Sequence, residues 1–423
     1  MDKKRIIRAV FLLLFLIVYP FLISSIASAA SASTPQLNSD SAVLIDARTG
    51  QVLFEKKMHK KQYPASITKV MTGMIALENG NLTDKITMSN EAVFSIGRNA
   101  AHIALDVGEI LTLEQVLYAL AIASANDAAN GIAEHIAGDM KSFARLMNLK
   151  ARELGALNTN FVNAHGLPDD DHYTTAYDMG LIMIQAIKNP QFCKIFSERR
   201  YEIPPTNLQP ETKFLYNKND LLNGQCNYEG IIASKSGWTT EAQHTLVTAA
   251  ERGDRKLVVV VMNSPSAKSK FEDTIALLDY GFNEFRKVRF DIASVESIVP
   301  KLDERNIVNI EVKPDEEITR LLHNSLTVDD VETNYKLLTD ADAQKIKVEM
   351  SLNLKKDSSL MFKNLGDTIL TFEIVERNNT EDKKESTGVG LLYYFIAGSS
   401  LFALYFIKQR RKRRRHYWNN KIY

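Results

Sequence analysis

The pattern of apolar and polar positions divides the chain into a strand-rich start, a long helical middle and a second strand-rich part. Near the start, SAVLID and QVLFEKK flank ARTG, which predicts a hairpin. In YPASITKVMTGMIALENG the apolar positions 67, 70, 71, 74 and 75 follow one face of a helix. The same spacing, or helix-forming composition, predicts helices at 64–79, 113–137, 141–154 and 175–188. Gly80, Gly138 and Gly155 are expected to end three of them.

Strand patterns return after the helical region. EGIIASKSGWT and HTLVTAAERGDRKLVVVVMNS, with an RGDR turn, predict strands, and a helix is expected at 271–285. Because strands stand at both ends with helices between them, we expect one α/β domain at 33–288 whose first and last segments share a sheet. From 289 to 378, short alternating runs such as KIKVEMSL and DTILTFEIV predict a second, β-rich domain.

The two ends of the chain have targeting patterns. A basic start, an uncharged run and small residues predict a signal peptide at 1–29. After a polar linker at 379–387, the run GVGLLYYFIAGSSLFALYFI at 388–407 has no charge and is long enough to form a transmembrane helix. The basic tail at 408–423 follows at once, so the positive-inside rule places it in the cytoplasm. We therefore expect a cell-membrane protein with one C-terminal span and an extracytoplasmic catalytic domain.

Charge and cysteine content narrow the possible partners. The 423 residues have a formal net charge of +1, but both ends are basic, so the part between them is acidic, with a charge near −10. This charge gives no general positive electrostatic potential that could attract nucleic acid. An anionic substrate must therefore be bound by local positive groups. Cys193 and Cys226 are the only cysteines, which is too few for a disulfide scaffold. Whether these two pair is left open.

A serine and a lysine one helical turn apart are the first candidates for chemistry. Ser66 opens the helix of PASITKVMTG, and Lys69 follows three residues later, so the two side chains can meet. The backbone N–H groups at this helix start can hold an oxyanion. Ala65, Ser66, Thr72 and Gly73 are the one-turn neighbours of Lys69, so no carboxylate on its own helix pairs with it. A desolvated, unpaired lysine has a lowered pKa, and we hypothesise that Lys69 is the base that activates Ser66.

Two later stretches give this pair a specific context. LAIASANDAANGIAEHIAG places Ser124, Ala125 and Asn126 at the end of an apolar helical run, and IIASKSGWTTEAQHTLV places Lys235, Ser236 and Gly237 on a strand. The order SxxK, SxN, K[ST]G resembles the serine penicillin-recognising enzymes. The flanks GEILTLEQVLYALAIASANDAANGIAEHIAG and NTNFVNAHGLPDDDHYTTAYDMG resemble the low-molecular-mass D-alanyl-D-alanine carboxypeptidases over about residues 40–290.

The resemblance implies a fold and a role for each matching residue. The fold would be an α/β (α+β) β-lactamase/DD-peptidase-like domain with an antiparallel sheet flanked by helices. Ser66 would be the nucleophile, Lys69 its general base and Ser124 a proton relay to the leaving D-alanine. Asn126 would bind the substrate amide and orient Lys69. The terminal carboxylate would be held by Lys235 and Ser236.

The same resemblance implies the rest of the site and its partners. The oxyanion hole would use the backbone N–H groups of Ser66 and Trp238, and Gly237 would let the substrate backbone lie against the strand. The partners would be a peptidoglycan stem peptide ending in D-Ala-D-Ala and β-lactams as covalent inhibitors, with no cofactor and no metal. Ala125, Ala164 and Ser236 replace the commoner glycine, proline and threonine without removing a functional group.

Three alternatives stay open. A DD-endopeptidase would use the same residues. A β-lactamase would need a deacylating glutamate, and ELGALN at 153–158 only approaches the ExxLN pattern, so Glu153 is expected at the surface. The third is a catalytically silent, membrane-tethered wall-binding scaffold. For the remaining polar groups, Asp169, Asp170, Asp171 and His172 are expected to form a solvated loop, His165 to be a structural hydrogen-bonder and Asp127 to bond locally.

Overall fold

The structure, a computed structural model, describes residues 34–97, 99–226, 228–290, 310–311, 318–338, 345–355 and 364–374. The predicted signal peptide, linker, transmembrane helix and basic tail lie outside these residues. No helix in the described ranges combines the length and apolarity needed to cross a membrane. The boundaries of the expected domains stay predictions.

The catalytic region is built on a five-stranded sheet in the order β2-β1-β9-β8-β7, with every neighbouring pair antiparallel. Its strands are β1 (Ser41–Asp46), β2 (Val52–Lys56), β7 (Ile231–Thr239), β8 (Gln243–Arg252) and β9 (Arg255–Ser264). The predicted hairpin is therefore confirmed as β1–β2. So is the expected sheet, because β1 from the start of the domain pairs directly with β9 from its end.

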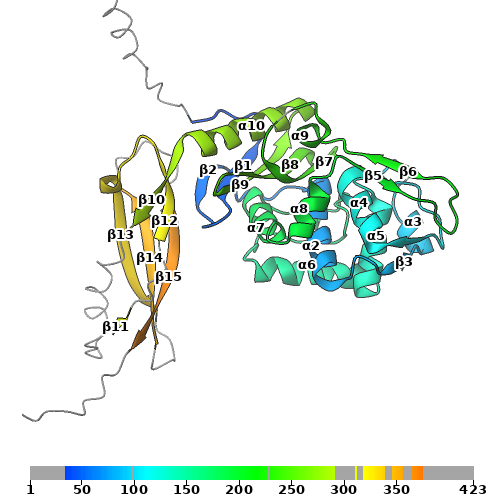
Figure 1. Ribbon diagram of the computed structural model, residues 1–423, viewed down its shortest axis with the longest axis horizontal. Coiled ribbons are helices and arrows are strands. Elements are labelled where there is room, and N and C mark those ends of the chain that lie inside the picture. The colour runs from blue at the N-terminus through cyan, green and yellow to red at the C-terminus, as the bar shows by residue number, and fades with distance from the viewer. Residues whose placement is uncertain are drawn as a thin grey trace, which may run out of the picture. The chain divides into compact units, whose positions relative to one another are not determined.

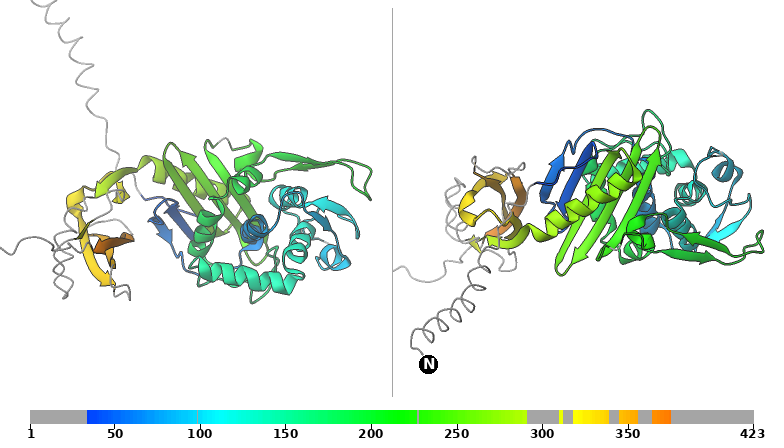
Figure 2. Two further views of the ribbon diagram at one scale, coloured as in Figure 1. Left: turned by 60° about the horizontal axis from the view of Figure 1, so that its bottom comes forward. Right: turned by 90° about the horizontal axis from the view of Figure 1, so that it is seen from above.

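Both faces of the sheet are buried, which explains the continuous apolar runs in the central strands. In β9, Val258, Val260 and Met262 join the core on one face, whereas Leu257, Val259 and Val261 join the core on the other. Side chains along a strand alternate between faces, so a strand covered on both sides reads as unbroken valine and leucine. Helix α10 (Ala267–Asn283) covers one face, and the helical lobe covers the other (Figures 1 and 2).

The helical lobe contains the long predicted helices. The predicted helix at 64–79 forms as a 3-10 turn, η1 (Ala65–Thr68), followed by α2 (Lys69–Asn79). The predictions at 141–154 and 175–188 are confirmed by α6 (Met140–Glu153) and α7 (Ala176–Ala186). The last predicted helix, at 271–285, is α10, which begins four residues earlier, after Ser266 caps its first turn by accepting from Ser269 N.

The helix predicted at 113–137 is not continuous. The apolar run at 113–137 is divided into α4 (Leu113–Tyr118), a π-helical turn η2 (Ala119–Ala123) and α5 (Asn126–Ala137). The break falls at Ser124, whose φ of 56° is left-handed. Apolar periodicity continues across this break because both pieces pack into the same core, so the pattern alone cannot show it.

Short elements complete the catalytic region. They are β3 (Lys85–Thr87) paired with β4 (Ile110–Thr112), β5 (Arg200–Ile203) paired with β6 (Lys213–Tyr216), and helices α3 (Asn90–Phe94), α8 (Pro190–Phe196) and α9 (Asp220–Asn223). These elements are too short for a periodic signal, and the sequence did not predict them.

The β-rich character expected after residue 289 is confirmed for the described residues. A four-stranded antiparallel sheet has the order β11-β15-β14-β13, from β11 (Ile310–Glu311), β13 (Val331–Leu338), β14 (Lys345–Leu354) and β15 (Asn364–Ile374). Strand β10 (Phe285–Phe290) pairs with β12 (Ile318–His323), and a 3-10 turn η3 (Val328–Asp330) precedes β13.

Packing between α2 and α8 depends on a glycine. A Cβ on Gly73 would lie 2.7 Å from the ring of Phe196, which is buried and stacked on Phe192 at 4.0 Å between centroids. For Gly73→Ala, a helix-propensity gain of about 1 kcal/mol is outweighed by an overpacking cost of about 1–3 kcal/mol. We expect a lower free energy of unfolding, measured by urea denaturation.

The matched control is Gly97→Ala, because no atom lies within 4 Å of the Cβ that it would add. Its stability should be unchanged or slightly higher, since alanine reduces the entropy of the unfolded chain. Equal unfolding midpoints for the Gly73→Ala variant and the parent would show that the Phe196 ring moves away without cost.

Candidate active site

The backbone before Ser66 is forced into an uncommon conformation. Ala65 has a φ of 51°, which places a residue with a side chain in the left-handed region. Thr245 of β8 donates a hydrogen bond to Pro64 O at 2.9 Å. Gly166 closes the other side, since a Cβ there would lie 1.9 Å from Ala65 O. The turn that presents Ser66 is thus fixed from both sides, and only glycine fits at position 166.

The amine of Lys69 is buried with three polar neighbours from three segments. Its Nζ lies 3.0 Å from Ser66 Oγ, 2.6 Å from Asn126 Oδ1 and 2.7 Å from His165 O. The side chain has no exposed surface. No carboxylate of the described residues forms an ion pair with it, as the helix pattern predicted.

This environment favours the neutral amine. Burial lowers the pKa of Lys69 well below its usual value, the charge of Lys235 lowers it further, and Asp127 opposes the shift. A neutral amine has two N–H donors and one lone pair. The two donors match Asn126 Oδ1 and the carbonyl of His165, which leaves the lone pair for the hydroxyl of Ser66. This geometry is compatible with the predicted role of Lys69 as a proton acceptor for Ser66, and the role itself stays a prediction.

The break between η2 and α5 supplies two more predicted groups. Ser124, in its left-handed conformation, has a buried hydroxyl without a hydrogen-bond partner among the described residues. Asn126 begins α5, and its backbone N–H donates to Ala101 O at 2.8 Å while its side chain contacts Lys69. A continuous helix would turn these two side chains in other directions, so the break is what brings Asn126 to Lys69 and Ser124 to the cleft.

Strand β7 forms the opposite wall. A Cβ on Gly237 would lie 2.7 Å from Ser66 N and 2.5 Å from Thr245 Oγ1, so the strand backbone lies directly against the amide of the serine. Lys235 is buried and donates to Ser236 O at 2.8 Å. Burial, followed by the charge of Lys270, lowers the pKa of Lys235 to about 7. Trp238 is 59% exposed at the mouth.

These residues enclose one cleft of about 360 Å³. Its lining includes Ser66, Ser124, Lys235, Ser236, Gly237 and Trp238. Lys69 and Asn126 lie buried behind Ser66. All predicted site residues therefore come together, although the groups come from elements as far apart in sequence as η1 and β7. Their catalytic roles stay predictions.

The cleft residues that the sequence analysis missed include two titratable side chains with lowered pKa values, Lys270 and His244. Lys270 lines the cleft from α10, and burial lowers its pKa to about 8. It lies on the buried face with Thr274, Leu277 and Gly281, and a lysine on the apolar stripe of a helix was the signal that could have revealed it. His244 faces Trp238 across the β7–β8 ladder, and burial and then Lys270 lower its pKa, so the ring is neutral at pH 7. No spacing pattern pointed to His244.

The remaining polar residues have structural roles. His165 is buried and its Nδ1 accepts from Leu167 N at 3.1 Å, as expected of a structural hydrogen-bonder. The expectation of a solvated loop is wrong for His172, which is buried and contacts Thr68 Oγ1 at 3.0 Å. Asp127 accepts from the adjacent Ala128 N at 2.9 Å, as expected of local bonding. It also accepts from the backbone of Ile103 and Leu105, both at 3.2 Å, and these two bonds join distant parts of the chain.

Glu153 and the two cysteines are also outside the cleft lining. The side chain of Glu153 is 67% exposed and pairs with Lys150 at 3.4 Å, which confirms its surface position. Cys193 and Cys226 are both free and half-buried, so no disulfide joins them.

A serine beside a buried neutral lysine, with a second serine and two buried cations across the cleft, defines an active-site-serine enzyme that transfers acyl groups. Comparison with known proteins identifies the family. The model of the protein family Peptidase_S11, described as D-alanyl-D-alanine carboxypeptidase, matches residues 28–266 of this chain. The chain belongs to this family of serine peptidases.

Individual relatives agree with this assignment. The chain is 31% identical to D-alanyl-D-alanine carboxypeptidase DacF of Bacillus subtilis over 85% of this chain and 92% of the relative. It is 30% identical to DacA of Haemophilus influenzae over 67% and 71%. The crystal structure of the Streptomyces DD-transpeptidase superposes with a TM-score of 0.56 at 29% identity, covering 59% of this chain and 99% of that one. The penicillin-binding-like α/β fold expected from the sequence is thereby confirmed.

The lowered pKa of Lys235 predicts how activity depends on pH. A lysine is charged below its pKa and neutral above it, so Lys235 loses its charge as the pH rises through about 7. We expect kcat/KM for a substrate with a terminal carboxylate to fall along this limb, because kcat/KM reports the free enzyme. In Lys235→Arg the guanidinium stays protonated, so the fall should disappear.

The measurement is kcat/KM for D-alanine release from pH 5 to 10 in both proteins. An unchanged alkaline fall in Lys235→Arg would assign it to another group, and Lys270, with a pKa of about 8, would then be the first candidate.

Proposed function

We propose that this chain is a D-alanyl-D-alanine carboxypeptidase that removes the terminal D-alanine of peptidoglycan pentapeptides through an acyl-enzyme on Ser66. The observation that carries the proposal is the 3.0 Å approach of Lys69 Nζ to Ser66 Oγ in a buried site where no described carboxylate forms an ion pair with the lysine. The family assignment supports the substrate class, since the similar proteins of Bacillus subtilis and Haemophilus influenzae are both named for this activity.

Acylation begins with proton transfer from Ser66 Oγ to Lys69 Nζ as the oxygen attacks the carbonyl carbon of the penultimate D-alanine. The backbone N–H groups of Ser66 and Trp238 hold the resulting oxyanion. The approach of Gly237 to Ser66 N supports this pairing, because it brings the β7 backbone to the serine amide. When the C–N bond breaks, the proton passes to the leaving D-alanine amine through Ser124, whose buried hydroxyl has no partner among the described residues.

Substrate binding uses the two buried cations. Lys235 attracts the terminal carboxylate by charge, and Ser236 donates a hydrogen bond to it. Lys270 adds a second positive charge on the same wall. Asn126 holds the substrate amide while its Oδ1 fixes the orientation of Lys69. Water then cleaves the ester on Ser66, which releases the shortened peptide and restores the hydroxyl. β-Lactams, which mimic the D-Ala-D-Ala end, form a stable ester on the same oxygen.

The proposal is tested by D-alanine release from a muramyl pentapeptide. A soluble form, residues 33–386, should release D-alanine, and its Ser66→Ala variant should be slower by about three orders of magnitude or more because the nucleophile is lost. Ser95→Ala, at a residue outside the cleft lining, is the matched control and should keep full activity.

A second substrate separates the alternatives. Cleavage of a D-alanyl cross-linked dimer without D-alanine release from the pentapeptide would favour the endopeptidase. Rapid turnover of benzylpenicillin would favour a β-lactamase, although the exposed position of Glu153 gives it no support. No reaction with any substrate would favour a silent scaffold.

We also propose that the protein is anchored in the cell membrane by residues 388–407, with the catalytic region outside and the basic tail inside. The apolar run and the basic residues after it support this topology. In a variant without Cys193 and Cys226, a Lys421→Cys thiol should react with a membrane-impermeant maleimide only after the membrane is opened. Fluorescent penicillin should label intact cells. Labelling of position 421 in intact cells would contradict the proposed orientation.

A further inference from the structure

A second hollow, larger than the catalytic cleft, lies elsewhere in the catalytic region. It has a volume of about 620 Å³, within the range of small-molecule sites. Four segments surround it: the turn after β1, the junction of α7 and α8, the start of β7 and the turn between β8 and β9. They contribute Ala47, Arg48, Ile184, Ile187, Lys188, Pro190, Cys193, Ile232, Glu251, Asp254 and Lys256. None of these residues lines the catalytic cleft.

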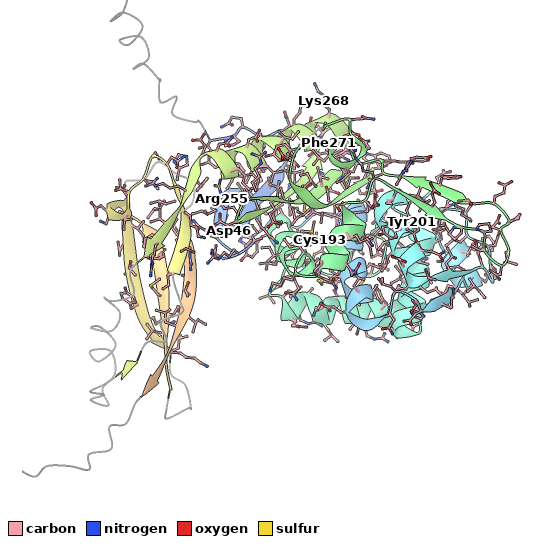
Figure 3. All side chains as sticks on the ribbon, viewed as in Figure 1. Asp46, Cys193, Tyr201, Arg255, Lys268 and Phe271 are labelled. Atoms are coloured by element: carbon pink, nitrogen blue, oxygen red, sulfur yellow. The ribbon has the colours of Figure 1, made fainter. Side chains whose placement is uncertain are left out.

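The lining has an apolar part. Its members are aliphatic or weakly polar side chains: Ala47, Ile184, Ile187, Pro190, Cys193 and Ile232. Cys193 lies on α8, in the middle of the catalytic region (Figure 3). Its half-buried thiol donates a hydrogen bond to Ile187 O at 3.4 Å, and burial raises its pKa. A ligand on this surface would therefore gain by burying a ring or a short chain.

The charged residues that line this hollow carry an excess of positive charge. Glu251 is paired with Lys256 at 3.3 Å, and Asp254 with Lys287 at 2.6 Å, so both acids are already neutralised. Lys188 forms no ion pair within the described part of the chain. Arg48 forms none there either. The charge of Arg48 acts on the buried Asp46, but the two groups form no ion pair and Asp46 also acts on Arg320. Two cations without an ion-pair partner in the described part of the chain therefore stand beside an apolar surface.

We propose that this hollow binds a small amphipathic anion, with its apolar body against Ile184, Ile187 and Ile232 and its acidic head facing Arg48 and Lys188. Charge complementarity favours an anionic head group, because a neutral ligand would leave both cations unpaired. The volume suits a ring system or short chain rather than a macromolecule. A carboxylate, sulfonate or phosphate head has the required charge, from either a soluble metabolite or a lipid.

The experiment measures alkylation of Cys193 by N-ethylmaleimide, followed by mass spectrometry. The full chain, with Cys226→Ser, is held in phosphatidylcholine nanodiscs. The probe is naphthalene-2-carboxylate, which has both an apolar ring system and an acidic head group. Naphthalene-2-methanol is the neutral control with the same ring system, and inorganic phosphate is the control that has an anionic group without an apolar body. We expect the carboxylate to slow alkylation by about fivefold or more at saturation, and the other two to have little effect. This readout does not use peptidase activity, so it is independent of the proposed function.

Charge reversal tests the two cations. Arg48→Glu with Lys188→Glu should raise the half-protecting concentration of the carboxylate by about tenfold or more. Lys85→Glu with Lys141→Glu, at exposed lysines outside the hollow, changes the net charge equally and should have no effect. Melting temperatures confirm that both variants fold.

The remaining outcomes are decisive. Protection by phosphatidylglycerol nanodiscs without added probe would support the site and identify a lipid as its anion source. No protection by naphthalene-2-carboxylate would overturn the proposal. Equal protection by naphthalene-2-methanol, or unchanged protection in the Arg48→Glu, Lys188→Glu variant, would reduce the hollow to an apolar crevice without anion selectivity.

Discussion

The active site depends on keeping the amine of Lys69 out of water. Lys69 has no exposed surface and forms no ion pair with a carboxylate in the part of the chain that the structure describes. Its ammonium form is therefore costly, so the fold stabilises the neutral form. Its neighbours are supplied by η1, by the first residue of α5 and by the loop at His165. Three segments that are far apart in the chain must therefore meet at one nitrogen. Displacing any of them would expose the amine or leave it unsatisfied.

Two left-handed residues are part of the cost of this arrangement. Ala65 and Ser124 both have positive φ, and such conformations cost about 1–3 kcal/mol each. That is a sizeable fraction of the 5–15 kcal/mol by which domains are typically stable. The surroundings compensate, because Gly166 and Thr245 hold the turn at Ala65, while buried core residues hold both sides of the break at Ser124. The hydroxyls of Ser66 and Ser124 are thus positioned by packing rather than by flexible loops.

Much of this could be predicted from local patterns, and the rest could not for identifiable reasons. The continuous apolar runs in β1 and β9 and the helical period after Ser66 follow from burial, which the residue types record directly. The spacing of Ser66 and Lys69 shows that they can meet, and the resemblance located Ser124, Asn126 and Lys235. The break at Ser124 was hidden because the apolar pattern runs through it. Lys270 and His244 reach the cleft through tertiary packing. The helical spacing marks Lys270 as buried but does not show that it faces the cleft, and no spacing pattern points to His244.

The strand order of the catalytic sheet also constrains how the protein assembles. The central pair joins β1 to β9 across roughly 200 residues of intervening chain, so this contact carries a large loop-closure cost. The β1–β2 hairpin emerges first during synthesis but has only a marginal stability by itself. The chain must then wait until β9 has left the ribosome before the sheet can close. Loss of the last strands would therefore leave the first hairpin with an unpaired edge. Ser66, near the start of the chain, is synthesised long before the residues of β7 that form the opposite wall of the cleft.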